Sequence, residues 1–139
     1  MSLLKNRKGM TLIEIMIVLA IIGSIVALLL PSLTGQLDKS KVKETRIKMT
    51  QIVQALSMYY TDCGKYPQTL EGLAKPDPNC SNWGPEPYYT KGFKDQFGHD
   101  FVYELEGSEF SLKSLGKDGR EGGDGYSKDI SLEDLDSGK

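Results

Sequence analysis

KGMTLIEIMIVLAIIGSIVALLL, residues 8–30, is the stretch that decides the fold of this chain. It follows a short basic leader and becomes, from Met10 onward, an apolar run of 21 residues whose single charge is Glu14. A helix of 21 residues is about 30 Å long, which matches the thickness of a bilayer core. A carboxylate inside such a segment is costly and therefore indicates a function.

Two simpler interpretations of this stretch are a secretory signal peptide and a plain membrane anchor. The leader has the positive charge that a signal peptide needs, from Lys5, Arg7 and Lys8. However, the apolar run is longer than the usual ~7–15 residues, and no A-x-A cleavage tripeptide follows it. A plain anchor gives no reason for Glu14, so both interpretations are disfavoured.

The junction between leader and apolar run resembles the prepilin signature of type IV pilins and type II secretion pseudopilins. The resemblance implies that a prepilin peptidase cuts after Gly9 and methylates the new N-terminus, Met10. Glu14 is then the fifth mature residue, where the family has its glutamate, although Met10 replaces the usual phenylalanine. In an apolar bundle this acid needs a positive partner. The freed amine of Met10 in a neighbouring copy is the predicted partner, which makes Glu14 and Met10 assembly residues.

Length and composition limit what the rest of the chain can be. The whole chain has 139 residues, which leaves room for one modest domain besides the anchor. Removing the three leader cations from the formal charge of −2 leaves −5. This acidic balance gives no indication of nucleic-acid binding. His99 is the single histidine, and there is neither a nucleophile elbow nor a P-loop, so an enzyme is disfavoured.

The apolar run is expected to continue as the second half of one helix of about 50 residues. Pro31 is expected to kink this helix, and Gly64 to end it. An apolar stripe at helical spacing is predicted to form the core of the C-terminal domain: Met49, Ile52, Val53, Leu56, Tyr59 and Tyr60. A charged stretch before it is predicted to be a solvated helix face, a subunit contact or both: Asp38, Lys39, Lys41, Lys43, Glu44, Arg46 and Lys48.

The segment after the helix, residues 63–95, is rich in Gly, Pro, Asn and Asp and is predicted to be a long loop with a turn of helix at 69–73. Alternating apolar residues predict a hairpin of strands 101–105 and 109–113 with one face on the helix. The acidic residues 131–139 are expected to fray.

Cys63 and Cys80 are the two cysteines, with no second pair to complete a zinc site. An exported domain would lie in an oxidising compartment, where such a pair can close. The sequence therefore predicts a disulfide if the domain is exported, and two unrelated thiols otherwise. A loop of this size contributes about 3 kcal/mol in the chain-entropy model.

Residues 115–129 combine five glycines with four carboxylates. Glycines let a backbone turn sharply, and carboxylates are the hard oxygen ligands that calcium prefers. The carboxylates are Asp118, Glu121, Asp124 and Asp129. Arg120 and Gly122 stand where an EF-hand needs ligands. Composition alone favours a flexible acidic loop.

This segment also resembles the C-terminal calcium loop of the major pseudopilins of type II secretion, with its G-x-D-G-x-x-G-G-[DE]-G run. Residues 66–73, 83–88 and 94–100 resemble other family segments, although Phe97 replaces a tryptophan and the cysteine pair is not general in the family. The resemblance implies calcium as the bound ion. Its implied ligands are Asp118 and the backbone carbonyl of Leu115, with Asp124, Ser127 and Asp129 as the candidates that complete the shell.

The resemblance implies an α+β, type IV pilin-like fold, in which one long N-terminal helix packs on a small antiparallel β-sheet. The expected parts are a cleaved leader (1–9), a transmembrane and filament-core helix (10–31) and a periplasmic domain (32–139). Within that domain we expect an amphipathic helix (32–62), a loop (63–95), a β-sheet with the calcium loop (96–130) and a tail (131–139).

The implied function is that of a structural subunit of a periplasmic pseudopilus that drives protein export. The implied location is the bacterial inner membrane, crossed once. The implied partners are copies of the same chain, the prepilin peptidase, the inner-membrane assembly platform, minor pseudopilins and inner-membrane lipid, with no nucleic acid. The alternative is a type IV pilin of a surface filament for adhesion, motility or DNA uptake.

Overall fold

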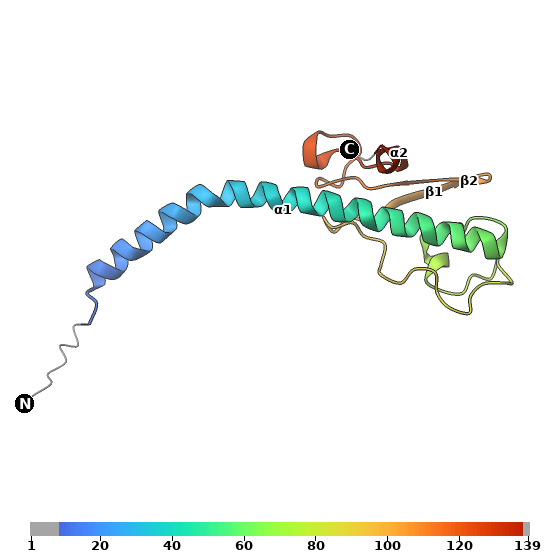
Figure 1. Cartoon of the computed structure of the whole chain (residues 1–139), viewed down its shortest axis with the longest axis horizontal. Helices are drawn as coiled ribbons and strands as arrows, with labels where there is room; N and C mark the ends of the chain where they lie inside the picture. Colours follow the sequence, from blue (N-terminus) through green and yellow to red (C-terminus); the bar gives the residue numbers. More distant parts are fainter. Residues whose placement is uncertain (1–8, 138–139) are drawn as a thin grey trace, which may run out of the picture. The chain divides into compact units, whose positions relative to one another are not determined.

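The computed structural model describes residues 9–137, so most of the predicted leader and the last two residues lie outside the described residues. Its main elements are α1 (Leu12–Cys63), β1 (Val102–Glu106), β2 (Glu109–Lys113) and α2 (Leu132–Asp136), with 3-10 helices at Leu70–Leu73 and Gly125–Ser127 (Figure 1). The chain divides into two compact units, Met1–Leu37 and Asp38–Lys139. The long helix and small antiparallel sheet confirm the predicted α+β, pilin-like fold.

The first unit contains the N-terminal half of α1, whose apolar side chains are exposed around the helix. Leu28 is 81% exposed and Leu12 is 74% exposed. A helix that is apolar on every side is stable only where other apolar groups surround it. The structure keeps Pro31 inside α1, and the Thr34 hydroxyl donates a hydrogen bond to the Leu30 carbonyl oxygen at 2.9 Å.

The core of the second unit is the predicted apolar stripe of α1. Met49, Ile52, Leu56 and Tyr59 are fully buried, and they cluster with buried apolar residues from the C-terminal part: Leu70, Leu73, Phe101, Leu112 and Ile130. Tyr60 is 45% exposed, so the prediction that it belongs to this core is wrong. It lies at the edge of the stripe, where its ring contacts that of Tyr66 with the centroids 4.8 Å apart.

The sheet is a two-stranded antiparallel hairpin in which Tyr103 pairs with Leu112, and Leu105 with Phe110. β2 has the predicted bounds, whereas β1 begins one residue later than predicted. The reason is that the Phe101 N–H donates to the Phe93 carbonyl oxygen at 2.9 Å instead of pairing with β2. Gly107 has φ 62° at the first position of the two-residue turn, as a tight hairpin requires.

The loop after α1 is held by local bonds and by a disulfide. α1 ends at Cys63, and Gly64 follows with φ 71°, as predicted. Cys63 and Cys80 form the disulfide, with their Cα atoms 5.3 Å apart. The expected turn of helix is the 3-10 helix Leu70–Leu73, and the Trp83 indole N–H donates to the Gly72 carbonyl oxygen at 2.6 Å.

The tail is ordered as α2, so the expectation that residues 131–139 fray is wrong for the described part, residues 131–137. The N–H and hydroxyl of Ser131 both donate to the Asp134 carboxylate, at 2.8 and 3.1 Å. The backbone bond holds the pKa of Asp134 below its usual value. Leu132 and Leu135 pack against the core, which explains why this acidic segment is helical.

Candidate functional site

The predicted processing and assembly residues lie at the start of α1. Gly9 and Met10 are exposed and precede the helix, and Glu14 lies in its first turn. The Glu14 N–H donates to the Thr11 hydroxyl oxygen at 3.2 Å, so Thr11 caps the helix. Thr11 was not among the residues predicted from the sequence, although T-x-x-E is the pattern of a capping box. Within residues 9–137, Glu14 has no salt-bridge partner.

The helix that carries these residues is also the candidate membrane segment. Among the described residues, α1 is the one helix that is long and apolar enough to cross a membrane, judged by length and composition. None of its most apolar window is buried within the chain. Glu14 is therefore a single carboxylate at one end of an otherwise apolar surface, near the positive end of the helix dipole.

The glycine-acid loop is closed at its base by a pair of backbone hydrogen bonds between Ser114 and Ile130, at 2.9 and 2.8 Å. All five glycines of residues 115–129 have positive φ. A Cβ on Gly123 would lie 2.6 Å from the Ser127 carbonyl oxygen, and one on Gly116 would lie 2.8 Å from the Lys128 carbonyl oxygen. The backbone is therefore packed so tightly that these two positions require glycine.

The predicted acidic ligands are placed in this loop but are not gathered around one point. Asp118 accepts a hydrogen bond from the Arg120 N–H at 3.1 Å, Asp124 is exposed, and Glu121 pairs with Lys113 at 3.0 Å. Within residues 9–137 no three His, Cys, Asp or Glu side chains are grouped so as to hold a metal ion.

Asp129 is the exception among these acids, because it is partly buried and incompletely satisfied. Its Oδ2 accepts a hydrogen bond from the Gly122 N–H at 3.1 Å, whereas its Oδ1 is buried without a hydrogen-bond partner in the described chain. A buried oxygen of this kind is costly unless a donor or a cation reaches it. Asp129 also lines a small cavity with Arg46 and Lys128, so basic side chains lie beside the predicted ligand.

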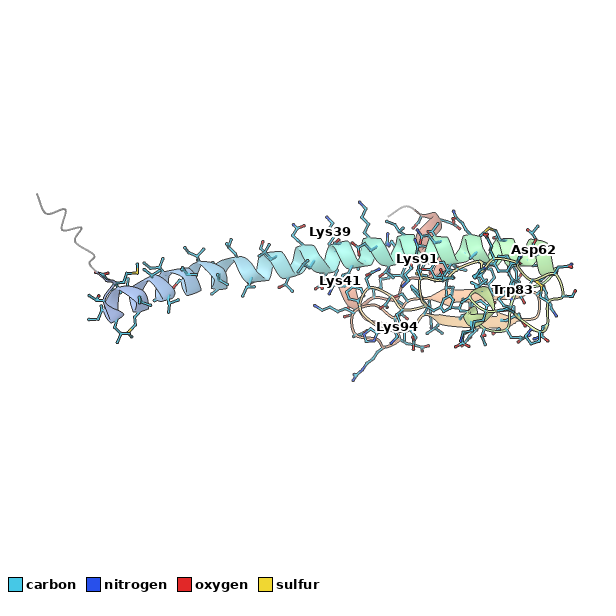
Figure 2. The ribbon with its side chains drawn as sticks, turned by 90° about the horizontal axis from the view of Figure 1, so that it is seen from below. Lys39, Lys41, Asp62, Trp83, Lys91 and Lys94 are labelled. Atoms are coloured by element: carbon cyan, nitrogen blue, oxygen red, sulfur yellow. A yellow bond between two sulfur atoms is a disulfide. The ribbon has the colours of Figure 1, made fainter. Side chains whose placement is uncertain are left out.

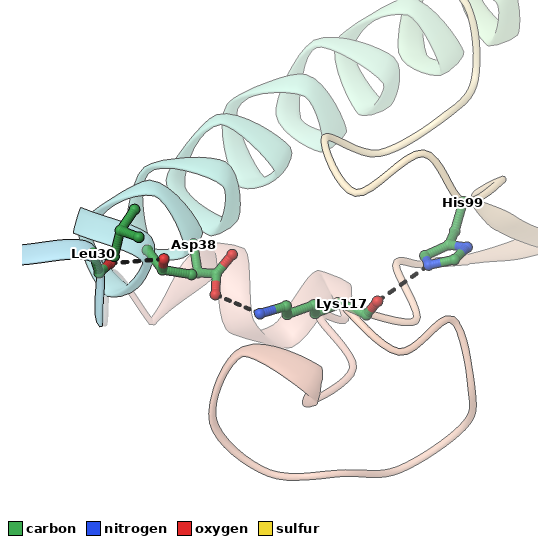
Figure 3. A network of polar contacts seen from close by, with 5 residues as sticks. Leu30, Asp38, His99 and Lys117 are labelled. Atoms are coloured by element: carbon green, nitrogen blue, oxygen red, sulfur yellow. Dashed lines mark hydrogen bonds and ion pairs between the residues drawn. The ribbon is translucent and has the colours of Figure 1, made fainter. Parts of the chain in front are cut away.

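An ion pair that the sequence did not predict ties the loop to α1. The Lys117 ammonium lies 2.7 Å from Asp38 Oδ2, and Asp38 is only 6% exposed (Figure 3). The prediction of a solvated face is therefore wrong for Asp38. The two residues are 79 positions apart, and no local pattern links them.

The single histidine supports the same loop. His99 Nε2 lies 3.2 Å from the Lys117 carbonyl oxygen, and a Cβ on Gly119 would lie 2.7 Å from the imidazole ring. The buried Asp95 carboxylate accepts hydrogen bonds from the His99 N–H at 2.9 Å and from the Ser114 hydroxyl at 2.7 Å. These contacts give His99 a packing role between residues 94–100 and the loop.

Tyr59, which is buried, and Tyr103, which is half-buried, have raised pKa values with structural causes. Burial and the hydrogen bond that its hydroxyl donates to Asp77 at 2.6 Å raise the pKa of Tyr59. The same bond lowers the pKa of Asp77. Burial raises the pKa of Tyr103 to about 12, and its hydroxyl donates to the Pro67 carbonyl oxygen at 2.6 Å. Both tyrosines fasten the long loop to the helix and the sheet.

Comparison with known proteins covers nearly the whole chain. Residues 32–133 match the family model described as type II secretion system protein G, and residues 4–30 match the prokaryotic N-terminal methylation motif. The chain is 37% identical to the type II secretion system core protein G of Pseudomonas aeruginosa, over 91% of this chain and 94% of that protein. The corresponding protein of Vibrio cholerae is 31% identical over 94% of each chain.

A solved structure is similar as well. The crystal structure of the major pseudopilin from the type 2 secretion system of enterohaemorrhagic Escherichia coli superposes with a TM-score of 0.58 at 25% identity, covering 73% of this chain and 94% of that one. Together with the apolar helix and its methylation motif, these matches show that the chain belongs to the protein G family of the type II secretion system, the structural, non-enzymatic major pseudopilins.

Proposed function

We propose that this pseudopilin is cut after Gly9, methylated at Met10 and assembled from the inner membrane into a periplasmic pseudopilus that drives protein export. The observation that carries the proposal is the exposed, all-round apolar half of α1 with Glu14 as its one charge. In the membrane this surface contacts lipid, and in a filament it contacts other copies of the chain. Either surrounding removes the same apolar area from water.

Glu14 gives this packing its register. A carboxylate among apolar helices is stable only if a cation meets it. Cleavage creates that cation as the amine of Met10, four residues before Glu14. We infer that the amine of one copy meets the Glu14 carboxylate of the next, which disfavours other axial offsets. The prepilin peptidase, the inner-membrane assembly platform and the minor pseudopilins are the further partners that this function requires.

We further propose that residues 115–129 bind calcium. The donor set suits this ion, because the loop offers the Asp118, Asp124 and Asp129 carboxylates, the Ser127 oxygens and the Leu115 carbonyl, which are hard oxygen ligands. The Oδ1 of Asp129 supports the proposal, because it is buried and has no hydrogen-bond partner within residues 9–137. When bound, calcium supplies two positive charges among like-charged carboxylates. These side chains are not grouped around one point in the structure, and the flexible glycine backbone can rearrange so that they surround the ion.

The test of assembly and export uses cells that carry the secretion system. Mass spectrometry of the membrane protein is expected to show a chain that starts at methylated Met10. Deletion of the protein is expected to abolish secretion, and the wild-type strain is expected to have no long surface pili by electron microscopy. A mass that retains residues 1–9 would contradict the processing proposal. Surface filaments on the wild-type cells, together with normal secretion by the deletion strain, would favour the surface-pilin alternative.

The test of calcium binding uses the mature protein in detergent, with Trp83, the single tryptophan, as the fluorescent reporter of unfolding. Ligand bound only by the folded state raises the melting temperature by mass action. We expect a higher melting temperature in calcium than in chelator, and a weak response to magnesium because of its strict octahedral geometry. Asp118→Ala is expected to abolish the response, whereas Glu133→Ala, outside the loop, is expected to keep it. Identical melting curves in calcium and chelator would refute the site.

A further inference from the structure

One end of the second unit carries exposed lysines on two segments that are far apart in the sequence. Lys39 and Lys41 lie on α1, and Lys91 and Lys94 lie on the loop before β1 (Figure 2). The Lys48 ammonium donates to the Lys94 carbonyl oxygen at 2.6 Å, which holds that loop against the helix. We call these four lysines the basic end. None of them has a salt-bridge partner within residues 9–137.

The opposite end of the same unit is acidic. Asp62 lies in the last turn of α1, and Glu106 and Glu109 flank the hairpin turn; all three are exposed. Ring contacts place the hairpin beside the last turns of α1, since Tyr66 contacts Phe110 at 4.6 Å and Tyr60 at 4.8 Å. Figure 2 shows Asp62 at the far end of the unit from Lys39 and Lys41. We call Asp62, Glu106 and Glu109 the acidic end.

The acidic end is electrostatically unfavourable within one chain, for two separate reasons. Glu106 and Glu109 are direct cross-strand partners, and like charges in that position destabilise a hairpin. Asp62 lies at the C-terminus of a long helix, where the helix dipole favours cations, and the last turn contains no basic residue. Among the described residues no salt bridge relieves any of the three carboxylates, and Asp62 accepts a hydrogen bond only from the neutral hydroxyl of Tyr88, at 2.6 Å. Cations from outside the chain would remove both penalties.

We propose that the acidic end of one copy docks on the basic end of the next copy along the filament. The inference rests on the proposed function, because filament assembly aligns all copies in one direction and offsets them along the axis. Parallel, offset copies present opposite ends to each other, which gives a head-to-tail contact that does not close. The complementary charges lie at those two ends, and they fix register and partner choice rather than supply most of the affinity.

Charge reversal in the full chain tests the contact in cells that assemble the filament. Lys39→Glu with Lys41→Glu is one variant, and Glu106→Lys with Glu109→Lys is the other. Each variant is expected to lower filament yield at least tenfold, with unchanged protein level in the membrane. The variant that combines all four changes restores the attraction and is expected to recover at least half of the wild-type yield. Lys75→Glu, at an exposed lysine that follows the 3-10 helix Leu70–Leu73 and is not part of the basic end, is the control and is expected to assemble normally.

The outcomes separate this inference from the proposed function. If wild-type protein forms no filament, the proposed function fails. If wild type assembles and either reversal also assembles normally, only the end-to-end contact fails. If the combined variant stays defective, cross-linking decides, with one cysteine in place of Lys41 and one in place of Glu109 in otherwise wild-type chains. Dimers joined through these cysteines support the contact, and their absence from assembled filaments overturns it. Because both ends are exposed, wild-type assembly is also expected to weaken with added salt.

Discussion

The two halves of α1 are parts of one helix but are stabilised in different ways. Residues 12–30 are apolar on every side apart from Glu14, and residues 12–37 bury almost nothing within the chain. Residues 38–63 bury one stripe, from Met49 to Tyr59, against a domain with its own core, disulfide and hydrogen bonds. The first half therefore depends on lipid or on other copies, and the second half folds on contacts within its own chain. Mutations in the first half should therefore lower filament yield, whereas mutations in the second half should lower the free energy of unfolding.

The largest effect is expected from the one charge of the first half. Glu14→Leu removes the carboxylate that the neighbouring Met10 amine needs, so filament yield is expected to fall at least tenfold, although the more apolar helix inserts at least as well. Electron microscopy and membrane fractionation measure the two quantities. Ser24→Leu, which also replaces a polar residue in the same run, is the control and should assemble. Normal filaments from Glu14→Leu would remove the charge-pairing account.

A pair of leucine truncations sharpens the comparison of the two halves. Leu56→Ala leaves a cavity in the core and is expected to lower the free energy of unfolding of the second unit by about 2–5 kcal/mol. Leu28→Ala removes the same atoms from a side chain that is exposed within the chain, so it should leave that free energy unchanged. Denaturant unfolding in detergent, followed by Trp83 fluorescence, measures both. Equal effects would mean that the halves unfold as one unit.

The disulfide lies wholly within the second unit, where it joins the end of α1 to the following loop. Cys63→Ser with Cys80→Ser opens a loop of 17 residues' separation and is expected to cost about 3 kcal/mol of unfolding free energy. Insertion in the membrane should be unaffected, since residues 12–37 make no contribution to this loop. The same fluorescence assay, with and without reductant on the wild type, checks the value. A wild type that is insensitive to reductant and a stable double variant would show that the loop is held by its hydrogen bonds.

The smallest expected effect is a pH dependence of the free energy of unfolding of the second unit. The Tyr59 hydrogen bond lowers the folded-state pKa of Asp77, so this carboxylate stabilises the fold above its unfolded pKa of 3.8. That stability is lost as the pH falls through the lower, folded pKa. Tyr59→Phe is expected to cost about 1–3 kcal/mol at neutral pH, because the bond to a charged group is lost, and to flatten the acid side of the stability curve. Tyr88→Phe, whose hydroxyl bonds the exposed Asp62, should change stability less.

The sequence by itself determined the features that depend on neighbours along the chain. The apolar run, the buried stripe of α1, the end of the helix before Gly64 and β2 all follow from local periodicity or from a glycine. Tertiary structure alone decided the pairing of Asp38 with Lys117, the packing of His99 against the loop and the order of α2. These features depend on groups that are brought together from distant positions. From the sequence alone, charged residues such as Asp38 were expected to be solvated. The acidic residues of the loop were visible as candidates, but their grouping was not, because glycine-rich backbone permits many arrangements and only packing and bound ligands select one.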